Sequence, residues 1–291
     1  MPDSDAAVPA PRRGTSTADV TTGETPVVEL RNVSKHFGGV HAVVDVSLHV
    51  DKGEVVALVG NNGAGKSTIM RMISGIHVPD SGDMLVSGNR VRFRGPREAR
   101  EAGIETVPQE LALTTHLSVA ANIFLGREVT RGWGPLQILD KKTMRQRSQE
   151  LIRGFGIHIP DLGARVYDLS GGQQQGVAIG RALAWGSRMI LLDEPTAALG
   201  IEETAQVERT VKSMRDEGVT VMLVSHNLDQ VFRVADRVYV LRRGHLVGER
   251  IIAQTSEDDL VALITGLRGH SAGNRPEHDS PGGSADQTEG T

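Results

Sequence analysis

The 291-residue sequence predicts an α/β fold built on a mostly parallel sheet. Short β-branched runs alternate with longer stretches of helical periodicity through most of the chain. The densest of the strand-like runs, 55–59 and 189–192, are apolar throughout, which indicates strands that are buried on both faces beneath helices. One of these runs, residues 54–59, leads directly into a glycine-rich loop and then into a helix, an order typical of phosphate-binding α/β domains.

The expected elements follow one another from residue 27 onward. The strands are expected at 27–30, 43–50, 54–59, 83–86, 104–107, 189–192, 219–224 and 237–241. The helices are expected at 66–73, 96–102, 119–125, 141–154, 172–185, 202–216 and 228–235. Residues 112–175 interrupt the alternation with helices and no convincing strand, so we expect a helical insertion there, with an exposed loop at 126–140.

Both ends of the sequence predict disordered tails. Residues 1–26 and 268–291 are rich in Gly, Ser, Pro, Asp and Glu, with too little apolar surface to offset the entropy of ordering. This leaves 27–267 as one folded domain. The first tail lacks the apolar run of a signal peptide, and no window approaches the roughly 18 apolar residues of a membrane span.

Composition and charge exclude several classes of function. The chain has no cysteine, so disulfides, thiol catalysis and thiolate zinc sites are excluded. Its formal net charge is −4, and a nucleic-acid partner is therefore not expected.

The strongest motif is the segment 60–68, which we call the phosphate loop. It fits the pattern G-x-x-x-x-G-K-[ST], in which glycines let backbone N–H groups converge on phosphate oxygens. Lys66 is expected to neutralise the β- and γ-phosphates, and Ser67 to offer its hydroxyl to Mg²⁺. The alternative is a glycine-rich turn that happens to precede a lysine. The expected ATP-binding residues here are Gly60, Asn61, Asn62, Gly63, Ala64, Gly65, Lys66, Ser67 and Thr68.

Two carboxylates stand where the apolar run 189–192 ends. Ligands of open α/β sheets bind at the carboxyl ends of strands, so Asp193 is a candidate for holding Mg²⁺ and Glu194 for accepting a proton from an attacking water. By itself this Asp-Glu-Pro sequence is also typical of a capped turn.

A second anion site is predicted at the start of a later helix, in the segment 169–173, which we call the signature segment. Ser170 is a good N-cap residue, and Gly171 and Gly172 leave backbone N–H groups uncovered. A simple N-cap is the plainer interpretation. It does not explain why one chain carries two phosphate-type sites and only one lysine-bearing loop.

With its sequence Leu-Ser-Gly-Gly-Gln, the signature segment resembles the motif that defines the ABC (ATP-binding cassette) ATPases, and the order of the motifs is similar over about residues 27–248. This resemblance implies an ABC-type P-loop NTPase: a RecA-like core, an N-terminal antiparallel β subdomain and a helical subdomain at about 112–175. It also implies head-to-tail pairing of two domains. Each ATP then lies between the phosphate loop of one protomer and Ser170, Gly171, Gly172 and Gln173 of the other.

The resemblance adds three site residues. Phe37 matches the aromatic that stacks on adenine, Gln109 the glutamine that touches Mg²⁺ or the attacking water, and His226 the histidine that contacts the γ-phosphate. Taken alone, Phe37 is typical of a core residue and His226 of a structural histidine at a strand end. The sequence departs from the family pattern at Gly200, where an Asp is usual, at Gly180 and at Gln174.

Residues 37–42, 60–63, 122–128 and 197–200 resemble ATPases of bacterial ribose/fructose-type sugar importers. We therefore expect a homodimer below two transmembrane permease subunits, at the cytoplasmic face of the membrane, served indirectly by an extracytoplasmic solute-binding protein. The alternatives are an importer of branched-chain amino acids or another small solute, and a soluble ABC ATPase with no role in transport.

Overall fold

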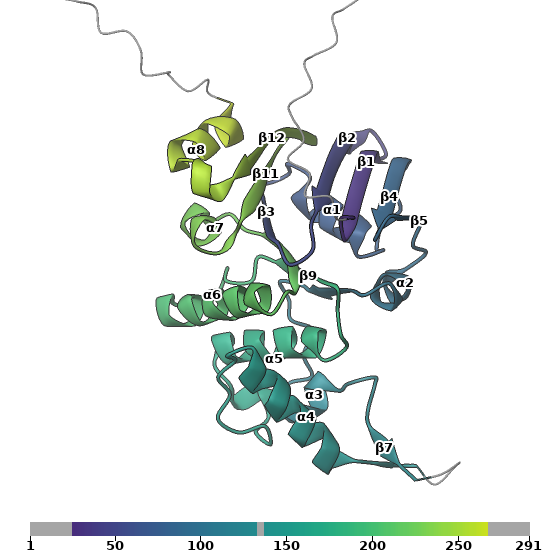
Figure 1. The fold of residues 1–291 in the computed structure, drawn as a ribbon, viewed down its shortest axis with the longest axis vertical. Helices are drawn as coiled ribbons and strands as arrows, with labels where there is room; N and C mark the ends of the chain where they lie inside the picture. Colours follow the sequence, from purple (N-terminus) through teal and green to yellow (C-terminus); the bar gives the residue numbers. More distant parts are fainter. Residues whose placement is uncertain (1–24, 133–136, 267–291) are drawn as a thin grey trace, which may run out of the picture.

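In the computed structural model, which describes residues 25–132 and 137–266, the largest element is a six-stranded sheet of order β12-β11-β3-β10-β9-β6 (Figure 1). The first five strands along the chain pair in parallel, and only β12 is antiparallel. The strands are β3 (Val55–Val59), β6 (Ile104–Val107), β9 (Met189–Asp193), β10 (Thr220–Val224), β11 (Arg237–Arg242) and β12 (His245–Ile251). The expected α/β class with a mostly parallel sheet is confirmed.

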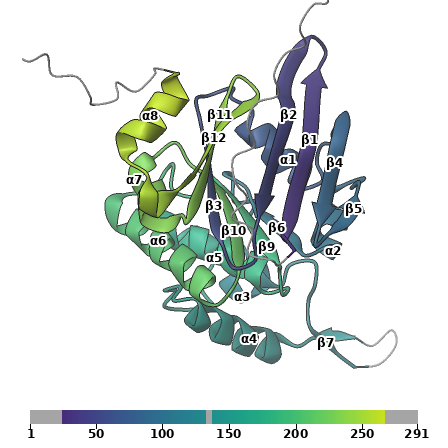
Figure 2. The ribbon, with the colours of Figure 1, turned by 45° about the horizontal axis from the view of Figure 1, so that its top comes forward.

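A second sheet, antiparallel and of order β2-β1-β4-β5, lies toward the N-terminus. Its strands are β1 (Val28–Phe37), β2 (Val40–Val50), β4 (Ser81–Val86) and β5 (Asn89–Val91). Helix α1 (Lys66–Ile73) lies between the two sheets, as Figure 2 shows, and its Ile69, Met72 and Ile73 are fully buried. The antiparallel N-terminal sheet is the one that the family resemblance implied.

The buried strands of the central sheet serve two hydrophobic cores, one on each face. Because side chains alternate along a strand, Val56 and Leu58 of β3 join the core around α1, whereas Val55, Ala57 and Val59 join the core on the opposite face. That opposite core is covered by α5 (Gly171–Leu183), α6 (Ile201–Asp216), α7 (Leu228–Val234) and α8 (Glu257–Thr265). This is why β3 and most of β9 are uninterrupted apolar runs in the sequence.

Helices dominate the part of the chain that we expected to be a helical insertion. It contains α3 (Val119–Ile123), α4 (Lys141–Gly154) and the 3₁₀ turn Val166–Asp168, and it packs against α5. The expectation that this part holds no strand is wrong, because β7 (Thr130–Arg131) and β8 (Ile138–Leu139) form a short antiparallel pair within 126–140. Two-residue strands are too short to show a hydrophobic period.

The expected helices differ from the observed ones by at most two residues at either end. The remaining helix of this set, α2, spans Pro96–Glu101. The sequence missed β5, β12, the 3₁₀ turn Ile252–Gln254 and α8, and it ended the first strand seven residues early. None of the helices in the described ranges is long and apolar enough to cross a membrane. The expected tails lie outside the described residues, apart from Thr25 and Pro26.

Candidate functional site

The phosphate loop connects β3 to α1 at the carboxyl edge of the central sheet. Gly60, Gly63 and Gly65 have φ angles of 146°, 76° and 106°, a region that favours glycine. A Cβ atom at Gly60 would collide with the carbonyl oxygen of Leu241 in β11, and one at Gly65 with that of Ala42 in β2. The loop thus needs glycine both for its backbone angles and because two strands of different sheets pack against it.

Lys66 is folded back onto this loop. Its Nζ donates to the carbonyl oxygens of Gly60, at 2.6 Å, and Asn61, at 3.1 Å, and the residue is only 6% exposed. Burial lowers the pKa of Lys66, while the nearby carboxylates Glu194 and Asp193 oppose that shift. The ammonium group is therefore held at the loop by carbonyl oxygens, and an anionic ligand would offer it stronger partners.

Asp193 is the last residue of β9, opposite Val224 of β10. Burial raises the pKa of Asp193 and the adjacent Glu194 raises it further, whereas Arg71 and Lys66 from α1 lower it. Sequence reasoning missed Arg71, which lies on the helix after the phosphate loop and matches no motif. A carboxylate with this surplus of negative charge is a suitable ligand for a divalent cation.

Glu194 follows directly and adopts the left-handed conformation, with a φ of 48°. Its backbone N–H donates to the carbonyl oxygen of Val224 at 3.0 Å, and its Oε2 lies 3.3 Å from Nδ1 of His226. The segment that carries His226 is held by Ser225, whose hydroxyl donates to Oε1 of Gln230 at 2.8 Å and accepts from the N–H of Asn227 at 3.0 Å. The structure thus brings Lys66, Asp193, Glu194 and His226 together at one edge of the sheet.

Gln109 lies two residues beyond β6, which is the neighbour of β9 with Val107 opposite Leu192. Its side chain is exposed. The segment that follows is anchored on α5, because the guanidinium of Arg181 donates to the carbonyl oxygens of Leu111 and Ala112 at 2.9 and 2.8 Å. Gln109 therefore stands on a loop shared between the sheet and the helical part.

Phe37 ends β1 at the tip of the β1–β2 hairpin and is 43% exposed. Its ring meets the His77 imidazole edge-on, with centroids 5.1 Å apart, and the ammonium of Lys35 lies 5.5 Å from its centroid. Within the described residues no hydrogen bond, ion pair or ring contact joins Phe37 to the phosphate loop. An exposed aromatic face of this kind can stack on a planar ligand.

The signature segment forms the start of α5. Ser170 is the N-cap: its hydroxyl accepts from the N–H of Gln173 at 3.4 Å, and its own N–H donates to Oε1 of Gln173 at 3.1 Å. The N–H of Gly172 donates to Oε1 of Glu203, at the start of α6, at 3.2 Å. Across the described ranges no hydrogen bond or ion pair links the signature segment to the phosphate loop. Within one protomer the N–H groups of the signature segment thus have no such link to those of the phosphate loop.

The chain is similar to known proteins of one family. Residues 43–197 match the model of a protein family described as "ABC transporter". The chain is 44% identical to a xylose/arabinose import ATP-binding protein of Sulfolobus acidocaldarius, over 82% of this chain and 94% of that protein. It is 39% identical to a fructose import ATP-binding protein of Rhizobium meliloti, over 84% of this chain and 96% of that protein.

Other relatives are longer or known in three dimensions. The chain is 39% identical to a ribose import ATP-binding protein of Clostridium tetani and spans about half of it, 48%. It superposes on an ATP-binding cassette of an ABC transporter in its ADP conformation with a TM-score of 0.70 and 25% identity, over 83% of this chain and 96% of that one. For a dimeric bacterial ABC transporter cassette the values are 0.64 and 27%, over 77% and 98%. The chain therefore belongs to the ABC transporter family, and it is an ATP-binding subunit that hydrolyses ATP.

Proposed function

We propose that the chain is the motor subunit of a membrane importer whose cargo is a monosaccharide. The observation that carries this proposal is the similarity to xylose/arabinose and fructose import proteins, which extends over 94% and 96% of their lengths. The chain would act at the cytoplasmic face of the membrane, bound to permease subunits that receive the sugar from an extracytoplasmic solute-binding protein.

In the proposed site, adenine stacks on Phe37 and the phosphates lie in the phosphate loop. Lys66 would exchange its carbonyl partners, Gly60 and Asn61, for phosphate oxygens. Ser67, Asp193 and Gln109 would hold Mg²⁺, and their oxygen donors suit this cation. The described residues contain no cluster of three or more His, Asp or Glu that could hold a metal without the nucleotide. The cation would neutralise charge on the β- and γ-phosphates.

For hydrolysis, we propose that Glu194 is the general base. Its carboxylate accepts a proton as a water oxygen attacks the γ-phosphorus, and the bond from that phosphorus to the β–γ bridging oxygen breaks, so that ADP and phosphate form. His226, whose Nδ1 lies 3.3 Å from Oε2 of Glu194, orients the carboxylate, and its other ring nitrogen contacts the γ-phosphate. Lys66 stabilises the charge that develops on the phosphate oxygens.

The site needs a second copy of the chain, because the signature segment and the phosphate loop are separate patches of one protomer. Ile201, beside Gly200 at the start of α6, exposes 91% of its surface. The similar cassette of known structure that is described as dimeric supports the same arrangement. In this homodimer each ATP contacts the phosphate loop of one protomer and Ser170–Gln173 of the other.

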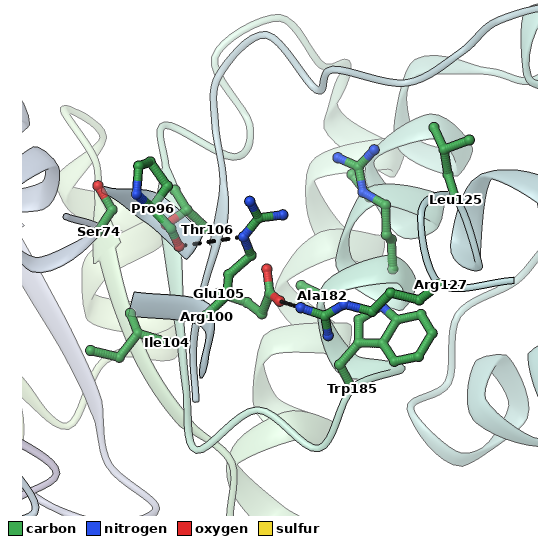
Figure 3. Close-up of a pocket in the computed structure, with 12 residues that line it drawn as sticks. Ser74, Pro96, Arg100, Ile104, Glu105, Thr106, Leu125, Arg127, Ala182 and Trp185 are labelled. Atoms are coloured by element: carbon green, nitrogen blue, oxygen red, sulfur yellow. Dashed lines mark hydrogen bonds and ion pairs between the residues drawn. The ribbon is translucent and has the colours of Figure 1, made fainter. Parts of the chain in front are cut away.

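A pocket of about 310 Å³ between the sheet and the helical part is the proposed contact for the permease. Arg100, Arg127 and Arg181 line it. Figure 3 shows the Arg127 side chain beside the Trp185 ring. Arg127 lies 3.5 Å from the Glu105 carboxylate, with its guanidinium 4.7 Å from the Trp185 ring centre. Burial raises the pKa of Glu105, and the three arginines oppose this shift. Since Arg181 also holds the loop after Gln109, a permease segment seated here would sense movements at the ATP site.

The test is to tag this chain in its native cell, solubilise the membranes gently and identify the proteins that co-purify. Recovery of a multi-span permease together with a sugar-specific solute-binding protein is the expected result. Recovery of a solute-binding protein specific for amino acids would show that the cargo is an amino acid and not a sugar. Recovery of ribosomes or nucleic acid without any membrane protein would overturn the transport role and leave the ATPase activity standing.

A further inference from the structure

The carboxylate of Glu203 bridges the starts of two helices. Glu203 is the third residue of α6; its Oε2 accepts from the N–H of Gly200, at 3.2 Å, and its Oε1 from the N–H of Gly172 in α5, also at 3.2 Å. Ser170 also interacts with this carboxylate. The two helices lie side by side in Figure 1. The side chain thus reaches from α6 into the signature segment.

The packing of the two helix starts makes this contact close. A Cβ atom at Gly172 would lie 2.9 Å from Cβ of Glu203, and one at Gly171 would lie 2.9 Å from Cδ2 of Leu199. Both glycines of the signature segment therefore have α6, or the loop before it, directly against them. A shift of the Glu203 side chain therefore alters its hydrogen bonds with Gly172 and with Gly200.

The partners of this carboxylate are the groups that a phosphate oxygen would need. Hydrogen bonds from Gly172, Gly200 and Ser170 lower the pKa of Glu203, and among the described residues no lysine or arginine pairs with it. Backbone N–H groups in the first turn of a helix and a cap hydroxyl attract anions of any kind. Glu203 and a phosphate group cannot both take the N–H of Gly172.

We propose that Glu203 is a positioning residue that occupies the signature segment in the free protomer and is displaced by the γ-phosphate of the ATP bound to the partner. This rests on the proposed head-to-tail homodimer. Displacement breaks the bond from Gly172 to Oε1 and shifts the carboxylate whose other oxygen, Oε2, accepts from Gly200. Binding of ATP at the signature segment is thereby coupled to the loop that ends at Gly200. This is the position at which the family usually has an aspartate.

The experiment measures ATP-driven dimerisation of the full chain by light scattering, in a Glu194→Gln parent that retains ATP. Adding Glu203→Gln removes the competing charge while keeping the size of the side chain and one acceptor oxygen. The ATP concentration at half-maximal dimerisation should fall by about threefold, the effect of one charge at a helix N-terminus. The matched control is Glu202→Gln, one residue earlier on α6 and exposed, which should leave this concentration unchanged.

If Glu203 were only a structural helix cap, the opposite result would be expected. Losing a cap would lower the Tm of the monomer and weaken the dimer, whereas the proposal expects a lower Tm with a tighter dimer. Glu203→Asp, whose shorter side chain can cap Gly200 without reaching Gly172, should also tighten the dimer and serves if the glutamine variant does not fold. An unchanged or higher ATP requirement in both variants would overturn the role of Glu203. A parent that forms no dimer with ATP would instead overturn the head-to-tail dimer, and this role with it.

Discussion

The carboxylate of Glu194 lies 3.3 Å from the imidazole Nδ1 of His226, although 32 positions separate them in the printed sequence. Parallel pairing of β9 with β10 places Asp193 opposite Val224, so the residues just beyond both strands meet at the same edge. The left-handed backbone at Glu194 turns the chain sharply at this point. The pair combines a proton acceptor with a group that can orient it.

Replacing Glu194 with Gln should remove the general base and keep the shape of the site. We expect ATP binding close to that of the wild type and a fall in turnover of about 100- to 10,000-fold. Phosphate release under saturating MgATP, together with a fluorescent-nucleotide titration, measures both quantities. Turnover near the wild-type rate would remove Glu194 from the role of base.

Replacing His226 with Ala should leave the base in place without its orienting partner. Turnover should fall by about 100-fold, the typical cost of misplacing a reacting group by about 1 Å. His245→Ala is the control, because His245 is exposed in the turn that begins β12. Equal ATPase rates for the two variants would show that the contact with Glu194 has no part in hydrolysis.

Lys66→Ala tests the phosphate loop. Losing a charged donor to the phosphates should cost about 1.5–3 kcal/mol, which is about 10- to 100-fold in the Kd for ATP. Lys52→Ala, on the exposed turn before β3, should bind as the wild type does. Unchanged affinity of Lys66→Ala, measured by equilibrium titration, contradicts the assignment of the loop.

In the part of the chain that the structure describes, Arg237 pairs with three carboxylates, those of Asp51, Glu54 and Glu249. Its guanidinium bonds Glu54 at 2.7 and 2.6 Å and Glu249 at 2.8 Å, in a position that is only 8% exposed. Arg237→Met should lower the free energy of unfolding by about 3 kcal/mol, because the carboxylates lose their counter-charge. Urea titration measures this, with the exposed Arg147→Met as control. A loss no greater than that of the control would show that the network contributes nothing to stability.

Local motifs allowed the phosphate loop, the buried strands and the order of the site residues to be predicted from the sequence. The loop needs only its own glycines and lysine, and fully buried strands leave an apolar run that any window reveals. Strand β12 was missed because it is an edge strand whose polar residues and Gly248 interrupt the apolar pattern. Helix α8 was missed because Leu260 is its only buried residue.

Two residues near the site could not be predicted from the sequence, for a different reason. Arg71 acts on Asp193 because α1 passes beside the end of β9, and Glu203 acts on Gly172 because α6 begins against α5. Neither relation has a fixed spacing along the chain. Glu203 does stand three residues after Gly200, which is the spacing of a helix-capping residue. That spacing gives no information about a contact with α5.

We propose that each nucleotide site is completed by a second copy of the chain. Specific ATPase activity at saturating MgATP, measured over a wide range of protein concentration, tests it most directly. If a dimer forms the site, activity per chain rises with protein concentration and levels off once all chains are dimeric. Constant activity per chain, with light scattering showing a monomer throughout, would mean that a single protomer holds a complete site and would contradict the account.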